Sequence, residues 1–137
     1  MAADLTPEVA GRLTEDDFGW LTTVAKSGLP VPRLIWFLFD GTELSIYTMP
    51  DAAKVAHIRR HPQVSVNLDS DGDGGGIIVA GGTARIEAEG LDPREDAPYW
   101  TKYAGHAEQI GIADVMANYS TLIKISIDKV WTTPTEA

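Results

Sequence analysis

Residues 33–49 read RLIWFLFDGTELSIYTM, and this stretch decides the fold. Arg33 to Phe39 is almost entirely apolar, which predicts a strand that is buried on both faces. Asp40-Gly41 supplies the residues of a tight turn, and Glu43 to Met49 alternates polar with apolar side chains, as a half-buried strand does. The stretch therefore predicts an antiparallel hairpin.

Further strands and helices are predicted on both sides of this hairpin. Runs rich in β-branched, aromatic or alternating residues indicate four more strands, at Phe18 to Val24, Val64 to Leu68, Ile77 to Glu89 and Thr121 to Ile127. Helix-start signals predict helices from Thr6-Pro7 to about Arg12, from Pro50-Asp51 to about Arg60, and over Asp92 to about Asn118 with a break at Gly105. The long strand is expected to bend near Gly81-Gly82. Six antiparallel strands with helices at the rim predict an α+β, mainly β, barrel that forms a single domain over residues 1–137.

The composition narrows the classes of function. The 137 residues carry a formal net charge of −9 and include no cysteine. Phosphate backbones bind basic surfaces, so we expect no nucleic-acid partner. No apolar run approaches the roughly 18 residues of a membrane span. The first residues also lack a signal-peptide pattern, so we expect a cytoplasmic protein with no membrane contact.

The sequence contains no complete motif for a metal site or for a catalytic site based on histidine. Residues 69–74 read DSDGDG and imitate the opening of a calcium loop, but the twelfth position is Ala80 where a bidentate glutamate is needed. An acidic hairpin loop is therefore favoured. The three histidines, His57, His61 and His106, lack a third ligand at metal spacing. No nucleophile elbow accompanies them, so we predict no metal site and assign no catalytic residue.

The helix predicted after Pro50-Asp51 carries a local concentration of positive charge in an acidic chain. Its cations include Lys54, Arg59 and Arg60. The N–H groups at its start, around Ala52 to Lys54, together with the Thr48 hydroxyl, form a possible phosphate site. Two facts favour a plain surface helix instead: charged residues usually occupy the wet face of a helix, and Asp51 at the cap competes for the same N–H groups. Both interpretations remain open at this point.

The aromatic residues also allow two interpretations. Trp36, Tyr47, Trp100, Tyr103 and Trp131 would serve as walls for a planar ring, or they would pack in the core, which is the commoner role of aromatic residues in strands.

The order of several short motifs resembles a known family. These motifs are GLPVPRLIWF at residues 28–37, FDG at 39–41, KVAHIRRHPQVSV at 54–66 and VAGGTA at 79–84. In this order they resemble the pyridoxamine-phosphate-oxidase-like split barrel, over about residues 13–131. The similarity is greatest to the actinobacterial branch that uses the deazaflavin coenzyme F420. The resemblance implies a split β-barrel and a reductase that transfers hydride from the reduced cofactor to an unsaturated small molecule.

The resemblance also implies which residues bind the cofactor. Tyr47, Thr48 and Lys54 would hold its phosphate, and Arg60 would help with its acidic tail. The ring would be flanked by Val31, Arg33 and Trp36 and approached at its edge by Ile77 and Ile78. The sequence departs from the family pattern at His57 and His61, and residues 51–53 offer neither arginine nor serine to the phosphate.

In that family the cofactor lies between two subunits, so the resemblance implies a homodimer, for which the apolar strand around Trp36 offers a surface. Flavin mononucleotide (FMN) is the alternative cofactor, because its phosphate needs the same turn. From a different class, the chain would be a non-catalytic cofactor carrier, or a haem-binding protein with His57 or His106 as axial ligand.

Overall fold

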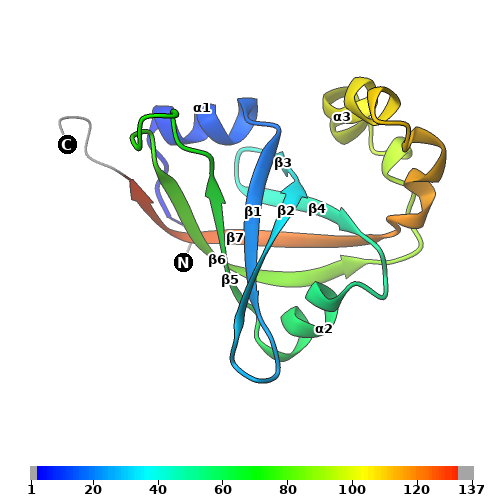
Figure 1. The fold of residues 1–137 in the computed structure, drawn as a ribbon, viewed down its shortest axis with the longest axis horizontal. Coiled ribbons are helices and arrows are strands. Elements are labelled where there is room, and N and C mark those ends of the chain that lie inside the picture. Colours follow the sequence, from blue (N-terminus) through cyan, green and yellow to red (C-terminus); the bar gives the residue numbers. More distant parts are fainter. Residues whose placement is uncertain (1–2, 133–137) are drawn as a thin grey trace.

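A single curled, antiparallel sheet forms the body of the protein (Figure 1). The computed structural model describes residues 3–132, so the two ends of the expected 1–137 domain, residues 1–2 and 133–137, lie outside the described part. The strands are β1 (Phe18–Val24), β2 (Pro30–Trp36), β3 (Leu38–Phe39), β4 (Glu43–Thr48), β5 (Gln63–Leu68), β6 (Ile78–Ala88) and β7 (Thr121–Thr132). Their order in the sheet is β2-β1-β5-β6-β7-β4-β3. The predicted α+β split barrel with peripheral helices is confirmed.

The sheet has seven strands where six were predicted, because the expected strand from Arg33 to Phe39 is interrupted at Phe37. The Phe37 N–H donates to the Tyr103 hydroxyl at 2.7 Å, and the Phe37 carbonyl accepts from that hydroxyl and from Lys102 Nζ. A side chain from a distant helix therefore satisfies the backbone that a continuous strand would pair. The last strand is also longer than predicted and continues to Thr132.

The helices surround the sheet at its rim, as Figure 1 shows. They are α1 (Pro7–Glu15), α2 (Ala53–Arg60) and α3 (Ala97–Gln109), with short 3₁₀ helices η1 (Pro93–Glu95) and η2 (Ala113–Asn118). Thr6 caps α1 as its sequence signal predicts, but the helix runs past Arg12 to Glu15. The predicted break at Gly105 is wrong: α3 continues through this residue and ends before Gly111, whose φ of +80° a glycine tolerates.

The start of α2 also differs from the prediction. Its N-cap residue is Ala52, without a side-chain hydrogen bond to the helix, whereas Asp51 was expected to occupy the cap. The helix therefore begins with N–H groups that no carboxylate caps.

The main core lies on the concave side of the sheet. Leu21, Phe37, Leu44, Ile123 and Ile125 are among its most buried members. Strand β6 shifts register between Gly81 and Gly82, which confirms the predicted bend. At Gly82 an added Cβ would overlap the Ser126 carbonyl oxygen, so the close approach of β6 and β7 requires glycine.

Strand β2 lies at one edge of the sheet, and its expected burial on both faces is wrong for the single chain. Leu34 is 52% exposed, because no element of the described chain packs over its face of the strand. The strand is apolar, as the sequence shows, but this face stays exposed in the described chain.

Residues 92–119, which contain η1, α3 and η2, form an excursion between β6 and β7. It leaves and rejoins the sheet at one point, where the Leu91 N–H donates to the Ser120 carbonyl at 3.0 Å. A second apolar cluster, built from Tyr47, Tyr99, Tyr103, Met116 and Leu122, joins this excursion to the sheet.

In the loop predicted to be an acidic hairpin, Asp71 Oδ1 accepts the N–H groups of Asp73 and Gly75, so this carboxylate shapes its own turn. Within residues 3–132, no helix combines the length and the apolar character that crossing a membrane requires.

Candidate functional site

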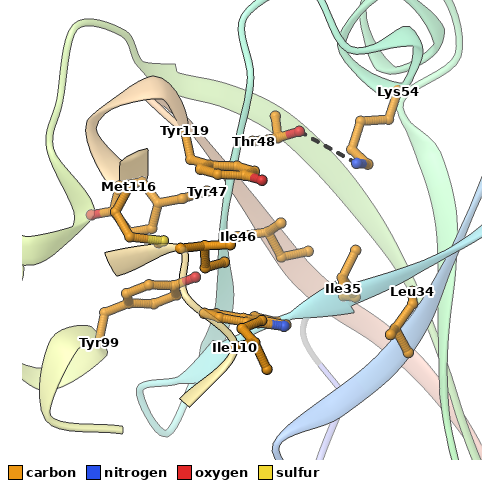
Figure 2. A pocket seen from close by; sticks show the side chains of 12 residues that line it. Leu34, Ile35, Ile46, Tyr47, Thr48, Lys54, Tyr99, Ile110, Met116 and Tyr119 are labelled. Carbon is orange, nitrogen blue, oxygen red and sulfur yellow. Dashed lines mark hydrogen bonds between the residues drawn. The ribbon is translucent and has the colours of Figure 1, made fainter. Parts of the chain in front are cut away.

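A cavity of about 380 Å³ lies between the sheet and the excursion (Figure 2). The sheet contributes residues of β2 and β4, α2 contributes one lysine, and the excursion contributes the rest. The lining residues are Leu34, Ile35, Trp36, Ile46, Tyr47, Thr48, Lys54, Tyr99, Ile110, Ile112, Met116 and Tyr119. Most of these side chains are apolar or aromatic, so the cavity suits a flat, largely apolar group.

One side of the cavity carries a positive charge. The Lys54 ammonium donates to Thr48 Oγ1 at 3.3 Å, and Thr48 is the last residue of β4 (Figure 2). Burial, and secondarily the nearby positive charge of Arg33, lowers the pKa of Lys54. No carboxylate among residues 3–132 forms an ion pair with this lysine. A partly buried cation without a protein counter-ion is suited to an anionic ligand.

Two further features lie next to this cation. Ala52 donates its N–H to the Met49 carbonyl, and α2 begins at Ala53 without a capping side chain, because alanine has no polar side-chain atom. Thr121 is the register partner of Thr48 on β7, and its Oγ1 is the one fully buried side-chain polar atom without a hydrogen bond in the described part of the chain. Polar groups therefore remain unsatisfied near the same end of the cavity.

The opposite side of the cavity is aromatic. Trp36 stacks on Tyr103 with ring centroids 4.9 Å apart and an interplanar angle of 15°. Tyr47 meets Tyr99 edge to face at 4.8 Å, and its hydroxyl donates to Asp96 Oδ2 at 2.7 Å. Because Asp96 also caps α3, the wall formed by Tyr47 is fixed to the start of that helix.

The predicted site residues fall into three groups. Trp36, Tyr47, Thr48 and Lys54 line the cavity together. Val31 and Arg33 lie farther along β2, on the same face as Ile35, which also lines the cavity, because side chains two residues apart in a strand share a face. The structure does not bring the other three to the cavity. Arg60 is exposed at the end of α2, Ile77 precedes β6, and Ile78 is 3% exposed in the main core.

Several lining residues were not identified from the sequence. Tyr99, Ile110, Ile112, Met116 and Tyr119 all belong to the excursion, whose contacts the sequence pattern does not define. One signal was present: Tyr99 and Tyr103 are four residues apart, so they share a helix face. Of the other aromatic residues considered as walls, Trp100 packs against the second cluster, and Trp131 lies over Gly81 with Lys129 on its ring.

The two histidines considered as haem ligands both have protein contacts. His57 Nδ1 forms a hydrogen bond with Thr23 Oγ1 at 2.8 Å. The ring of His106 packs against Phe18 and Trp36, each with a centroid separation of 5.1 Å. Neither histidine lines the cavity. The geometry instead fits a planar ring that carries a phosphate: an apolar, aromatic space with an uncompensated lysine and a threonine hydroxyl at one end.

Comparisons with known structures show the same fold. A conserved hypothetical protein, Rv2991, from Mycobacterium tuberculosis superposes with a TM-score of 0.73 at 20% identity, covering 99% of this chain and 96% of that one. A protein described as an F420 reductase gives 0.66 at 19% identity, with 93% and 100% covered. An FAD-binding protein from Mesorhizobium loti gives 0.67 at 24% identity, with 92% of each chain covered.

No curated protein matches the sequence significantly. The model of one protein family, described as pyridoxamine 5'-phosphate oxidase, matches residues 5–134, which is nearly the whole chain. The motif order, the split barrel and this match agree, and the chain therefore belongs to the pyridoxamine 5'-phosphate oxidase family.

Proposed function

We propose that this protein is an oxidoreductase that binds the deazaflavin coenzyme F420 and reduces an unsaturated small molecule. One observation carries the proposal: Lys54, a partly buried cation without a carboxylate partner, stands at one end of an apolar, aromatic cavity. In a chain of net charge −9, such a cation is a specific place for a negatively charged ligand group.

Each end of the cavity has a role in this proposal. Lys54 and Thr48 hold the phosphate of the cofactor, and Trp36 and Ile35 border its ring system. When bound, the reduced deazaflavin supplies the hydride. The protein supplies orientation and the cofactor supplies the reactive group, which explains why no acid-base pair dominates the site.

Arg33 gives a reason to prefer the deazaflavin. It lies close enough to Lys54 to lower the pKa of that lysine, so two cations face the same region. Guanidinium keeps its charge when partly buried, and it would stabilise the negative charge on the pyrimidine side of a reduced deazaflavin. Arg60, exposed at the far end of α2, remains available for the acidic tail.

FMN is the second candidate, because its phosphate needs the same lysine and threonine. A structurally similar protein is described as FAD-binding, so a flavin is the alternative cofactor. At 24% identity this similarity supports a shared fold and does not identify the cofactor. FMN has no acidic tail, so in an FMN protein Arg60, which lies outside the cavity, would have no cofactor group to bind.

A homodimer completes the proposal. A row of five residues in register crosses β2, β1, β5, β6 and β7 on the sheet face opposite the main core: Leu34, Trp20, Asn67, Val79 and Trp131. Leu34, Trp20 and Trp131 are 52%, 39% and 48% exposed. Three large exposed apolar side chains on one sheet face, as Leu34, Trp20 and Trp131 are here, are typical of a protein interface. The row begins on β2 beside the cavity, so a second subunit on this face would border the cofactor.

The test is a titration of the protein with F420 and, separately, with FMN, followed by cofactor fluorescence. Lys54→Met should weaken F420 binding by about 10-fold or more, the value for a charge-assisted hydrogen bond in a partly buried site. Lys26→Met is the matched control, because Lys26 is exposed in the β1–β2 turn.

Selective F420 binding that depends on Lys54 and not on Lys26 supports the proposal. Tighter binding of FMN would favour the flavin alternative. Equal losses in both variants would show that the effect is one of net charge, and would remove Lys54 from the site.

A further inference from the structure

The cavity contains a hydroxyl group that no protein atom uses. Tyr99 is 1% exposed and lines the cavity, and its hydroxyl has no hydrogen bond to any of residues 3–132. Figure 2 shows this hydroxyl pointing toward the centre of the space between the lining side chains. Among the described residues, only Thr121 Oγ1 is a side-chain polar atom that is both fully buried and without a partner. The Tyr99 hydroxyl also has no partner, so it is not fully buried and retains accessible surface towards the cavity.

The other buried tyrosines show that this arrangement is unusual within the same cluster. The Tyr103 hydroxyl binds the backbone of Phe37 and the carbonyl of Asp17, and the Tyr47 hydroxyl donates to Asp96 and points away from the cavity (Figure 2). The Tyr99 hydroxyl faces the cavity without a protein acceptor, so an acceptor atom on a ligand would be its first direct partner. The half-buried Tyr119 also lines the cavity, but its position lets solvent reach it.

The surroundings of Tyr99 define the acceptor that fits. Ile46 and Met116 lie near it, and the lysine lies at the other side of the cavity (Figure 2). A carboxylate at this end would therefore be desolvated without a cation, whereas a neutral oxygen needs one donor only. Burial raises the pKa of Tyr99, so the hydroxyl keeps its proton and acts as a donor.

We infer that the Tyr99 hydroxyl is a catalytic residue that donates a hydrogen bond to the carbonyl oxygen of a neutral, planar, conjugated carbonyl substrate. This inference rests on the proposed function, because it places the hydride acceptor at the tyrosine end and the cofactor phosphate at the Lys54 end.

The role of the hydroxyl follows from how charge moves in such a reduction. Hydride addition to the β-carbon moves the electron pair of the carbon–carbon double bond toward the carbonyl oxygen, which becomes negatively charged. Tyr99 donates its hydrogen bond to that oxygen as the charge grows, and water supplies the proton that completes the α-carbon. The substrate gains one hydride and one proton, and the reduced deazaflavin is oxidised by two electrons. A donor placed in an apolar site stabilises such a charge more strongly than water does.

The test uses cofactor-free protein and two ligands of similar shape, 2-acetylnaphthalene and 2-ethylnaphthalene, of which the first has a conjugated carbonyl and the second has none. Binding is measured by quenching of tryptophan fluorescence in the wild type, in Tyr99→Phe and in Tyr119→Phe. Because Tyr99 makes no hydrogen bond to the protein, Tyr99→Phe should fold normally.

We expect Tyr99→Phe to weaken 2-acetylnaphthalene binding roughly 3–10-fold, the value of one neutral hydrogen bond, and to leave 2-ethylnaphthalene binding unchanged. Equal effects on both ligands, no effect on either, or a carbonyl-specific loss in Tyr119→Phe instead would overturn the assignment. So would a ketone that does not bind the wild type.

The infrared carbonyl stretch of bound 2-acetylnaphthalene is a second measurement that needs no variant. It should shift to lower frequency than in an apolar solvent, as it does for a hydrogen-bonded ketone. An unshifted stretch would contradict the inference. These measurements are independent of F420, so their failure is distinguishable from loss of the Lys54-dependent cofactor binding.

Discussion

Tyr103→Phe should lower the free energy of unfolding by about 2–4 kcal/mol. The Tyr103 hydroxyl accepts the Phe37 N–H at 2.7 Å, and its proton lies within reach of the carbonyl oxygens of Phe37 at 2.6 Å and Asp17 at 2.7 Å. Phe37 is fully buried, so its N–H group cannot turn to water when the hydroxyl is removed.

The magnitude follows from counting what each group retains. The Phe37 carbonyl keeps the Lys102 ammonium at 2.9 Å, and the exposed Asp17 can bond to water. Only the Phe37 N–H becomes an unpaired buried donor, which costs about 1–3 kcal/mol, and the net value of the lost hydrogen bond adds about 1 kcal/mol.

Tyr99→Phe is the matched control. Tyr99 lies one turn earlier on α3 and is equally buried, but its hydroxyl has no protein partner. Its removal should therefore change the free energy of unfolding by less than about 0.5 kcal/mol. Urea denaturation followed by circular dichroism, at one protein concentration, measures both variants. Similar losses in the two, or a loss below about 0.5 kcal/mol for Tyr103→Phe, would refute the reasoning.

Three further predictions concern the sheet, the lysine and the interface. Gly82→Ala should destabilise the fold by about 2–3 kcal/mol through overlap with the Ser126 carbonyl, whereas Gly105→Ala, with open space at an exposed helix position, should stabilise it by about 0.5–1 kcal/mol; equal urea midpoints would contradict this. F420 affinity should fall as pH rises through the lowered pKa of Lys54, because a bound phosphate favours the protonated amine. The loss should therefore begin below pH 10.5, with a flat profile in Lys54→Met, and a midpoint at or above 10.5 would count against it. Leu34→Glu should convert a dimer to a monomer in light scattering, because it buries a charge in the proposed interface; a dimer that persists would argue for another contact surface.

The sequence predicted the sheet well because its signals are local. The Asp40-Gly41 turn is an example, since the Asp40 carboxylate accepts the N–H groups of Thr42 and Glu43, and both partners lie within three residues. The bend at Gly82 likewise follows from a residue type that suits a bulge. The sequence signals for both features are residue types at single positions, so one sequence is enough to find them, although the contact that requires glycine at Gly82 is with the distant Ser126.

The errors arose where distant residues decide the structure. The interruption at Phe37 depends on Tyr103, 66 positions later, and the strand pattern contains no sign of it. Gly105 was expected to end a helix because glycine weakens helices, but α3 packs through Tyr99, Tyr103 and Ala107, and this packing outweighs one unfavourable residue.

The candidate site divides in the same way. Lys54 and Thr48 were identified because they lie six residues apart, where β4 gives way to α2, and one motif contains the lysine. Tyr99 and Tyr119 were missed because their positions depend on how the excursion folds back over the sheet, which periodicity does not specify.

The hydrogen bond between Leu91 and Ser120 closes residues 92–119 into a loop whose two ends meet. An insertion with adjoining ends can be exchanged without moving the strands that carry it. Here the lysine end of the cavity belongs to the barrel and the tyrosine end belongs to the exchangeable segment. Under the proposed function, replacement of this segment alone would change the substrate and leave the cofactor site in place. A chimera that carries a foreign segment between Leu91 and Ser120 should then inherit the acceptor preference of its donor.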